Sequence, residues 1–210
     1  MIELFDKPEC PFCYRVRLCL GALELAYERT AYDTPEAELR WRALTTANTV
    51  PVFVCDDLVL TDSAVILEYL ADRFGGVLEG DARQRAQIRE MLQRADNPVG
   101  RAVREVVFEK RAGPPEGWDR DRIARAEEAW RTCLPKIEAQ VHGNFLAGDR
   151  FSVADAAMAG RFGLAFAYGL ELPPGLPRLA AWWAARTAEP FFYEASPPKV
   201  RAFLDEATTR

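Results

Sequence analysis

Residues 2–25 read IELFDKPECPFCYRVRLCLGALEL, and this stretch decides the fold expected for the chain. It places a short apolar strand, Ile2–Phe5, before a segment with helical periodicity, Pro11–Leu25. Proline is favoured in the first turn of a helix, where its missing N–H is not needed. Cys10 and Cys13 therefore lie where a strand gives way to the start of a helix.

The segments that follow alternate between strand and helix signals. We expect a strand, a polar helix, two strands joined by a turn, and a closing helix over Tyr27–Tyr32, Glu36–Ala47, Pro51–Cys55, Leu58–Leu60 and Asp62–Phe74. The order is βαβ-α-ββα, which implies a small sheet covered by helices. A glycine-rich segment without periodicity follows at residues 74–81. We therefore expect an α/β domain over residues 1–75 and a linker over residues 76–82.

Strand signals are missing from the expected second domain, residues 83–210, which reads as all-α. The expected helices are Arg83–Arg111 with an interruption at Asn97-Pro98, Asp119–His142 with a kink at Pro135, one opening at Ser152, Leu176–Thr187 and Pro198–Thr208. Ser152 can cap its helix, and Asp155 can accept from the backbone N–H of Ser152. The pairs Trp182-Trp183 and Phe191-Phe192 are expected in the core. The arginines between Arg83 and Arg104 are typical of a solvated helix face, or of one that lines a cleft.

Composition excludes several classes of protein. The 210 residues are 49% apolar and 28% charged, as in folded globular chains. A net charge of −5 argues against nucleic-acid binding, and a single histidine leaves almost nothing for a Ser-His-Asp triad or a multi-histidine metal site. No segment approaches the ~18 apolar residues of a membrane span, and the charged N-terminus lacks a signal peptide's apolar run. Five cysteines give no complete disulfide framework, so we expect a cytoplasmic protein with reduced thiols.

The motif that can carry chemistry is Cys10-Pro11-Phe12-Cys13. Unpaired backbone N–H groups and the positive end of the dipole at a helix N-terminus favour the thiolate of Cys10. The thiolate is the nucleophilic form, so Cys10 is the candidate nucleophile and Cys13 the candidate resolving thiol. Half a zinc site and two packed, inert thiols are the alternatives. The other three cysteines are isolated in the sequence, which argues against zinc.

Two further segments admit both a ligand-binding and a purely structural interpretation. Pro51 enters a strand and is either cis, which would expose the backbone N–H and C=O of Val50, or a plain strand-edge proline. Thr61 or Asp62 can cap the helix that follows the fourth strand. The free N–H groups near Ser63 can instead hold a carboxylate. The sequence alone leaves both choices open.

Four segments together resemble the glutathione transferase superfamily, of the cysteine type. They are CPFCYRVRLCL (10–20), TVPV (49–52), TDSAVILEYLADRF (61–74) and FSVADAA (151–157). The resemblance covers the whole chain and implies the glutathione-transferase fold. In that fold a thioredoxin-like, glutathione-binding half precedes an all-helical half that contributes the acceptor pocket. CPFC is similar to omega-type transferases, dehydroascorbate reductases and the larger two-domain glutaredoxins.

The resemblance also implies a set of site residues. Cys10 would face the glutathione sulfur, and glutathione would be bound by Pro11, Phe12, Val50, Pro51, Asp62 and Ser63. Val50 would pair by its backbone with the cysteinyl part, while Asp62 and Ser63 would hold the γ-glutamyl group. Residues 45–49 lack the family's frequent Asn-Pro-x-Gly form, so the glycine-end contacts stay unassigned, with Arg42 and Asn48 as nearby candidates. Glutathione as co-substrate, no metal and a homodimer are further implications.

We therefore expect a glutathione-dependent thiol–disulfide oxidoreductase. Cys10 would become glutathionylated, and a second glutathione or Cys13 would release it. One alternative is a cysteine-type transferase that acts as a dehydroascorbate reductase or thioether lyase. Another is a non-catalytic interaction protein on the same scaffold, since fold alone does not prove catalysis. The aromatic content of the helical half suits a small apolar or aromatic acceptor, or a mixed disulfide, with no nucleic acid or membrane partner.

Overall fold

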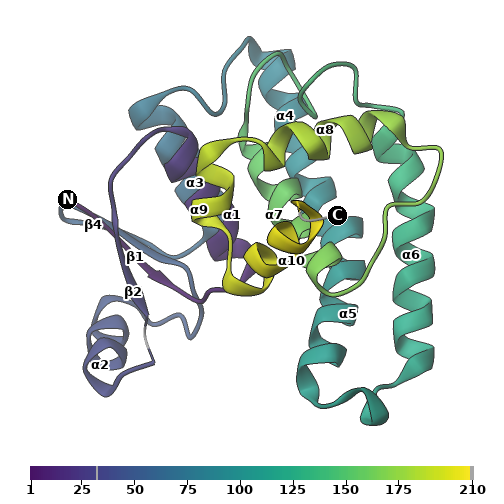
Figure 1. The fold of residues 1–210 in the computed structure, drawn as a ribbon. Helices are drawn as coiled ribbons and strands as arrows, with labels where there is room; N and C mark the ends of the chain where they lie inside the picture. The colour runs from purple at the N-terminus through teal and green to yellow at the C-terminus, as the bar shows by residue number, and fades with distance from the viewer. Residues whose placement is uncertain (32, 209–210) are drawn as a thin grey trace.

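The computed structural model describes residues 1–31 and 33–208, and a four-stranded mixed sheet organises the N-terminal part (Figure 1). The strands are β1 (Ile2–Asp6), β2 (Glu28–Ala31), β3 (Val52–Cys55) and β4 (Leu58–Leu60), in the spatial order β2-β1-β3-β4. β1 pairs parallel with β2 and antiparallel with β3, and β3 pairs antiparallel with β4. The strand expected over Tyr27–Tyr32 thus occupies Glu28–Ala31, and Tyr32 lies outside the described residues.

The two faces of the sheet are covered by different helices. Leu4 and Phe53 are opposite one another in the register and are buried in the core formed with α1 (Pro11–Ala22) and α3 (Ser63–Phe74). Phe5 and Val52, the next register pair, pack instead against Trp41 of α2 (Pro35–Leu44). This alternation follows the two-residue repeat of a strand. The predicted βαβ-α-ββα order is confirmed.

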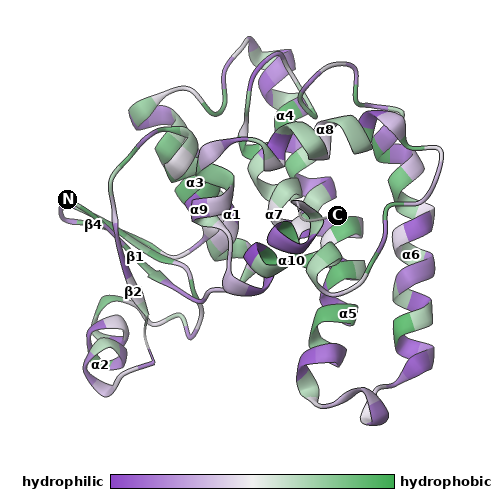
Figure 2. Ribbon diagram, in the orientation of Figure 1, coloured by the Kyte–Doolittle hydropathy of each residue, from purple (hydrophilic) through white to green (hydrophobic). Residues whose placement is uncertain are grey.

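The second part of the described chain is helical. Its helices are α4 (Ala82–Arg94), α5 (Gly100–Ala112), α6 (Arg120–Glu138), α7 (Val153–Ala167), α8 (Pro177–Thr187), α9 (Pro190–Ala195) and α10 (Pro198–Thr208), with a π-helical turn η1 (Ala95–Val99) and a 3₁₀ turn η2 (Pro115–Gly117). Helix α7 lies at the centre, and its residues 153–165 are all buried (Figure 1). By contrast, α6 alternates hydrophobic and hydrophilic residues along its length (Figure 2). Among the described helices, none has the length and apolar character needed to cross a bilayer.

Three features of this half differ from the sequence-based expectation or sharpen it. The interruption at Asn97-Pro98 is confirmed, because η1 separates α4 from α5 and this peptide bond is cis. Helix α6 continues through Pro135 and ends at Glu138, before the expected end at His142. A tight last turn ends it, in which the N–H of Val141 donates to the carbonyl of Glu138 at 3.2 Å. Helix α9 is an element that the sequence analysis missed.

The two parts of the molecule are joined through α1, which packs against α7 and α9. The hydroxyl groups of Tyr14 and Ser196 lie 2.5 Å apart in the interior. The ring of Phe192 in α9 packs against that of Tyr14 at an interplanar angle of 53°, with ring centres 6.1 Å apart, and Trp182 is buried in the same core. The core prediction for Trp182 and Phe192 is confirmed, while Trp183 and Phe191 are partly buried against that core.

Candidate functional site

Cys10 occupies the N-cap position of α1, directly after the loop that follows β1. Its backbone is extended, and its carbonyl accepts the first intrahelical bond, from the N–H of Tyr14 at 2.9 Å. Within the described part of the chain, the N-cap residue makes no side-chain capping bond, so the first backbone N–H groups of the helix stay available to the cysteine sulfur. The Sγ also lies 3.8 Å from the carbonyl oxygen of Val50. The two segments that carry Cys10 and Pro51 therefore meet at one edge of the sheet.

The surroundings of Cys10 stabilise its thiolate. A hydrogen bond from the thiol of Cys13, together with bonds from the backbone N–H groups of Cys13 and Phe12, lowers the pKa of Cys10 from 9.0 to about 6. Partial burial and the charge of Asp6 oppose this effect without cancelling it. Cys10 is therefore largely a thiolate at neutral pH, which is the state that attacks electrophiles and disulfides.

Cys13 has the opposite character, although it lies only one helical turn away. It is 0% exposed, and burial, followed by its hydrogen bond to Cys10 and by the negative charge of Cys10, raises its pKa strongly. Cys13 thus keeps its proton and acts as the donor to Cys10. Both cysteines are free thiols in this structure.

A buried ion-pair network holds the loop between β1 and Cys10 from behind. Asp6 accepts from Arg17 Nη1 at 2.6 Å and from Arg29 Nε at 2.7 Å. Arg17, which is fully buried, also donates to the carbonyls of Pro8 and Ala195, at 2.8 Å and 2.7 Å. These bonds satisfy the buried guanidinium and tie the loop to α1 and to the end of α9. Neither arginine stands out as a site residue in the sequence.

Glu9, the residue before the cysteine, is turned toward the helical half. Its carboxylate accepts a hydrogen bond from the hydroxyl of Tyr168 and lies 3.7 Å from Arg111 Nε. The same contact with Glu9, together with burial as the larger cause, raises the pKa of Tyr168. The negative charge next to Cys10 is therefore bound by two groups from outside the sheet domain.

The structure shows the local geometry of the two segments for which the sequence admits two interpretations. The Val50–Pro51 peptide is cis. Asp62, rather than Thr61, caps α3, since its carboxylate accepts from the N–H groups of Ala64 and Val65 at 2.8 Å and 3.2 Å. The structural interpretation of Asp62 as an N-cap is thus confirmed.

Ser63 lies at the end of a second buried network that sequence reasoning missed. Its hydroxyl accepts from Arg15 Nε at 3.1 Å and Nη2 at 2.5 Å. Arg15 and Arg161 both bind the carboxylate of Asp96, at 2.8 Å and 2.9 Å. The ring of Phe12 lies 5.1 Å from the guanidinium carbon of Arg15 and 4.8 Å from that of Arg161. The sequence signal for this network is one arginine in each of two largely apolar helices, Arg15 in α1 and Arg161 in α7.

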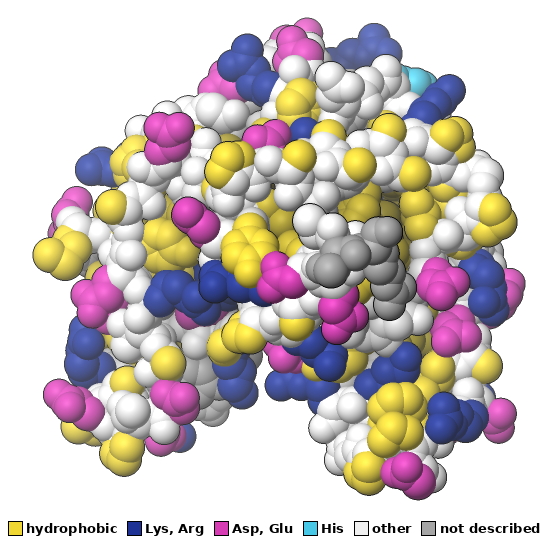
Figure 3. Space-filling view, viewed as in Figure 1, with side chains coloured by type: hydrophobic (Ala, Val, Ile, Leu, Met, Phe, Trp, Pro, Cys, Tyr) yellow, Lys and Arg dark blue, Asp and Glu magenta, His cyan; other side chains and the backbone are white. Residues whose placement is uncertain are grey.

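A cleft of about 1350 Å³ opens beside Cys10, between the N-terminus of α1 and the helices α5 and α7. The described residues that line it are Asp6, Lys7, Pro8, Glu9, Cys10, Pro11, Phe12, Ala31, Asp33, Asp96, Asn97, Gly100, Arg101, Val103, Arg104, Val107, Phe108, Arg111, Ala112, Arg161 and Leu164. Figure 3 shows the molecule hollowed between the lobe that carries α2 and the lobe of α5 and α6, with Lys and Arg side chains along the hollow.

The predicted site residues divide into two groups around this cleft. Cys10, Pro11 and Phe12 line it. Among the described lining residues there is none of the other predicted glutathione contacts, Val50, Pro51, Asp62 and Ser63, nor the nearby candidates Arg42 and Asn48. Val50 contacts the cysteine sulfur, and Ser63 is linked through Arg15 to Asp96, which lines the cleft. The arrangement presents one activated thiolate between a cleft and the edge of the sheet.

Comparison with known proteins identifies relatives of this chain over both of its parts. The glutathione S-transferase N-terminal domain matches residues 4–78, and the glutathione S-transferase C-terminal domain matches residues 107–190. Glutathione S-transferase GST-4.5 of Xanthomonas campestris pv. campestris is 30% identical over 201 residues, which are 90% of this chain and 94% of that protein.

Two solved structures have the same fold. A glutathione S-transferase from Rhodospirillum rubrum F11 aligns with a TM-score of 0.81 and 26% identity, over 98% of this chain and 99% of that one. A theta class glutathione S-transferase from Xanthomonas axonopodis pv. citri, with glutathione bound, aligns with a TM-score of 0.80 and 22% identity, over 92% and 96% of the two chains. With its two domain matches and full-length relatives, the chain belongs to the glutathione S-transferase family.

Proposed function

We propose that the protein catalyses glutathione-dependent thiol–disulfide exchange at Cys10. The observation that supports this most directly is the uncapped N-terminus of α1, where Cys10 has a pKa of about 6 and borders an open cleft. Exchange is fastest when the attacking thiol has a pKa near the ambient pH, because a lower value costs nucleophilicity and a higher value leaves less thiolate. Cys10 lies close to that optimum.

The proposed reaction has two balanced steps. The thiolate of Cys10 attacks the glutathione sulfur of a mixed disulfide, so that a Cys10–glutathione disulfide forms and the other thiol leaves as a thiolate. The thiolate of a second glutathione then attacks the glutathione sulfur on Cys10. Oxidised glutathione leaves, and the Cys10 thiolate is regenerated. Over one cycle a single glutathione thiolate is consumed, the disulfide bond passes from the mixed disulfide to oxidised glutathione, and no other reductant is needed.

Cys13 suits a supporting role in this scheme better than a resolving one. It is buried and its pKa is raised, so it offers little thiolate to attack a disulfide. We propose that a second glutathione releases the enzyme, while Cys13 donates a hydrogen bond that keeps Cys10 ionised. Of the two release routes left open by the sequence, this one needs no exposure of a buried side chain.

The proposed binding site for glutathione lies beside Cys10, at the end of the sheet where β1 stops and β3 begins. The carbonyl of Val50 already lies against the cysteine sulfur, as a backbone partner for the cysteinyl part would. The hydroxyl of Ser63 accepts two bonds from Arg15, so its own proton is left to donate to a carboxylate. Glutathione is bound in the theta class structure described above, which has the same fold.

Intact mass after treatment with oxidised glutathione tests the proposal. The reduced Cys13→Ser variant should gain one glutathione, which peptide mapping places on Cys10 and which excess reduced glutathione removes. Cys10→Ser serves as the matched control and should gain none. A folded Cys13→Ser protein that forms no adduct at Cys10 would show that the helix terminus does not activate the thiol.

The same thiolate also suits thioether cleavage and dehydroascorbate reduction, so a substrate panel must separate these activities. Cleavage of a glutathione thioether releases a free thiol when no disulfide is present. Dehydroascorbate reduction is followed by the absorbance of ascorbate. If exchange is the main activity, kcat/KM for the mixed disulfide should exceed the values for the thioether and for dehydroascorbate. A higher kcat/KM for either of those two substrates would replace exchange as the proposed function.

A further inference from the structure

One face of helix α5 lines the cleft with basic and aromatic side chains at helical spacing. Arg101, Arg104, Phe108 and Arg111 recur at intervals of three or four residues, which places them along one side of a helix. All four line the cleft that Cys10 also lines. The wall opposite the candidate nucleophile therefore combines guanidinium groups with an aromatic ring.

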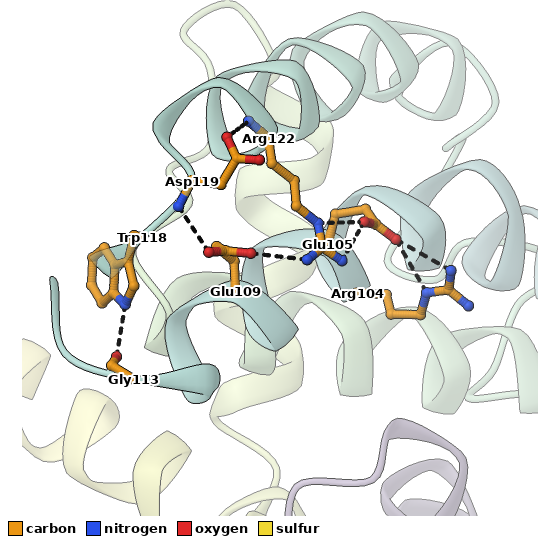
Figure 4. Close-up of polar contacts among 7 residues, drawn as sticks. All are labelled: Arg104, Glu105, Glu109, Gly113, Trp118, Asp119 and Arg122. Carbon is orange, nitrogen blue, oxygen red and sulfur yellow. Dashed lines mark hydrogen bonds and ion pairs between the residues drawn. The ribbon is translucent and has the colours of Figure 1, made fainter. Parts of the chain in front are cut away.

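One of these arginines keeps a charge that no described residue pairs, and a second is paired only with a neighbouring carboxylate at the protein surface. Arg101 is exposed and has no hydrogen-bond or ion-pair partner in the part of the chain that the structure describes. Arg104 lies 3.2 Å from the carboxylate of the adjacent Glu105. That carboxylate is also bound by Arg122 at 2.7 Å, and Arg122 in turn binds Glu109 at 2.9 Å (Figure 4). The guanidinium of Arg104 therefore shares its one acidic partner among the described residues with a second arginine and stays 60% exposed at its side chain.

The acidic groups around the cleft do not offset these arginines. The described lining residues include four acids, Asp6, Glu9, Asp33 and Asp96. Three of them already accept bonds from the arginine and tyrosine side chains described above. Asp33 follows β2 and belongs to the sheet domain, on the other side of the cleft from α5. The α5 wall thus presents positive charge that can receive a ligand carboxylate.

Exposed aromatic surface accompanies that charge. Many of the large aromatic residues of the helical half pack on one another in the core, so those rings are not available to a ligand. The aromatic rings that line the cleft within the described chain are Phe12 and Phe108, which are 40% and 53% exposed. Guanidinium forks match carboxylate geometry, and a neighbouring ring can cover an apolar body.

We propose that the acceptor of this enzyme is an organic anion, whose carboxylate is bound by Arg101 and Arg104 and whose apolar or aromatic body lies against Phe108. This inference rests on the exchange reaction proposed above and names its substrate class. The acceptor would be the thiol half of a mixed disulfide with glutathione. Cys10 attacks the glutathione sulfur, and the anionic thiol leaves from the α5 side of the cleft.

Two matched substrates test the charge requirement. The mixed disulfides of glutathione with 4-mercaptobenzoic acid and with 4-mercaptobenzamide have nearly the same size and differ in one negative charge. We expect a higher kcat/KM for the acid in the unmodified enzyme. The ratio of the two kcat/KM values should fall about tenfold in Arg101→Gln/Arg104→Gln, because charge-assisted hydrogen bonds to the carboxylate are lost. The preference should also weaken with added salt.

A control variant separates a local contact from the general field of the protein. Arg83→Gln/Arg125→Gln removes the same charge from exposed positions that do not line the cleft. It should keep the ratio of acid to amide. An equal fall of the ratio in both double variants would overturn the proposal. The proposal would also be overturned if Arg101→Gln/Arg104→Gln kept the ratio of acid to amide but raised the KM for glutathione. In that case the two arginines would bind glutathione itself.

A binding measurement keeps this proposal distinct from the exchange chemistry. Calorimetric titration of the Cys10→Ser protein with S-(4-carboxybenzyl)glutathione and S-(4-carbamoylbenzyl)glutathione needs no reaction. Tighter binding of the acid, lost in Arg101→Gln/Arg104→Gln, would support the anion site even if exchange activity were absent. Turnover of both mixed disulfides without preference, and equal binding of both analogues, would overturn the anion site and leave exchange standing.

Discussion

The helices α1 and α7 both begin with backbone N–H groups that have no partner within the helix, and the two helix ends differ in what these groups bind. At α7, the carboxylate of Asp155 is 0% exposed and accepts from the N–H groups of Ser152 and Leu146, each at 3.0 Å, and from Trp182 Nε1 at 2.8 Å. At α1, the N-cap is Cys10, and no side-chain bond closes the helix end. One terminus uses its free N–H groups for folding, and the other directs them at a thiolate.

The burial of the two ends explains this division. The α7 terminus is enclosed by α4, α8 and the loop before it, where an unpaired N–H would be costly. The α1 terminus borders the cleft, where water or a ligand can reach the sulfur. Changes at α1 should therefore remove chemistry with little loss of stability, while changes at α7 should do the reverse.

The largest effect is expected at the α1 terminus. Cys10→Ser should reduce glutathione-dependent disulfide reduction to the uncatalysed background, because a serine hydroxyl does not ionise at neutral pH. The free energy of unfolding in urea should change by less than about 1 kcal/mol, since no cap or core contact is lost. A Cys10→Ser enzyme with its activity intact would place the chemistry elsewhere.

The matching change at α7 should destabilise the fold. Asp155→Ala leaves buried donors on Leu146, Ser152 and Trp182 without their acceptor, and it should cost about 3–5 kcal/mol in urea unfolding. Asp149→Ala, in the loop before α7 and 87% exposed at its side chain, is the control and should change little. The comparison fails if Asp155→Ala is as stable as the unmodified protein.

The pH dependence of alkylation distinguishes the two cysteines of α1. The pKa of Cys10 is lowered to about 6, so its reaction with iodoacetamide should slow as the pH falls through 6 and level off above neutrality. Cys13, whose pKa is raised, should stay unmodified in the folded protein. Peptide mapping gives the rate at each position, and the urea-unfolded chain supplies the profile of ordinary thiols. A Cys10 midpoint equal to that of the unfolded chain would exclude activation by the helix terminus.

The smallest effect is expected from the donor to Cys10. Cys13→Ala removes the hydrogen bond that contributes most to the lowered pKa, so the alkylation midpoint of Cys10 should move upward from about 6 toward its ordinary value of 9.0. Cys13→Ser keeps a hydroxyl donor and should move it less. The difference between these two variants isolates the hydrogen bond from the volume of the side chain. Identical midpoints would assign the activation to the backbone alone.

Local sequence patterns were sufficient to predict the order of elements. Strands such as Ile2–Phe5 and helices such as Asp62–Phe74 are indicated by hydrophobic periods of two and 3.6 residues. The structure has both elements with bounds within a few positions of the predicted ones. Helix α9 spans only six residues, too few for a period to appear. The end of α1 was also placed late, because Glu24 takes a positive φ of 53° that apolar spacing does not reveal.

The residues around the thiol were predictable only in part. The position of Cys10 at a helix start follows from the short distance along the chain between β1 and Pro11. The partner of Arg15 on η1, in contrast, lies 81 positions away, and no local signal identifies it. The aromatic content of the helical half suggested the lining of the acceptor pocket, yet most of those rings pack on one another. The number of aromatic residues in the sequence does not determine which of their rings point into the cleft and which point into the core.

The long-range bonds of α1 also set an order of events during synthesis. Tyr14 and Arg17 bond to Ser196 and Ala195, partners that the ribosome adds 182 and 178 residues later. Chains emerge N-terminal end first, so the helix that carries Cys10 leaves the ribosome long before these partners exist. The loop before the cysteine gains its last support only when α9 has been made. The hydrogen bonds that activate Cys10 are local to α1, whereas the bonds that fix this helix against the rest of the fold wait for the last part of the chain.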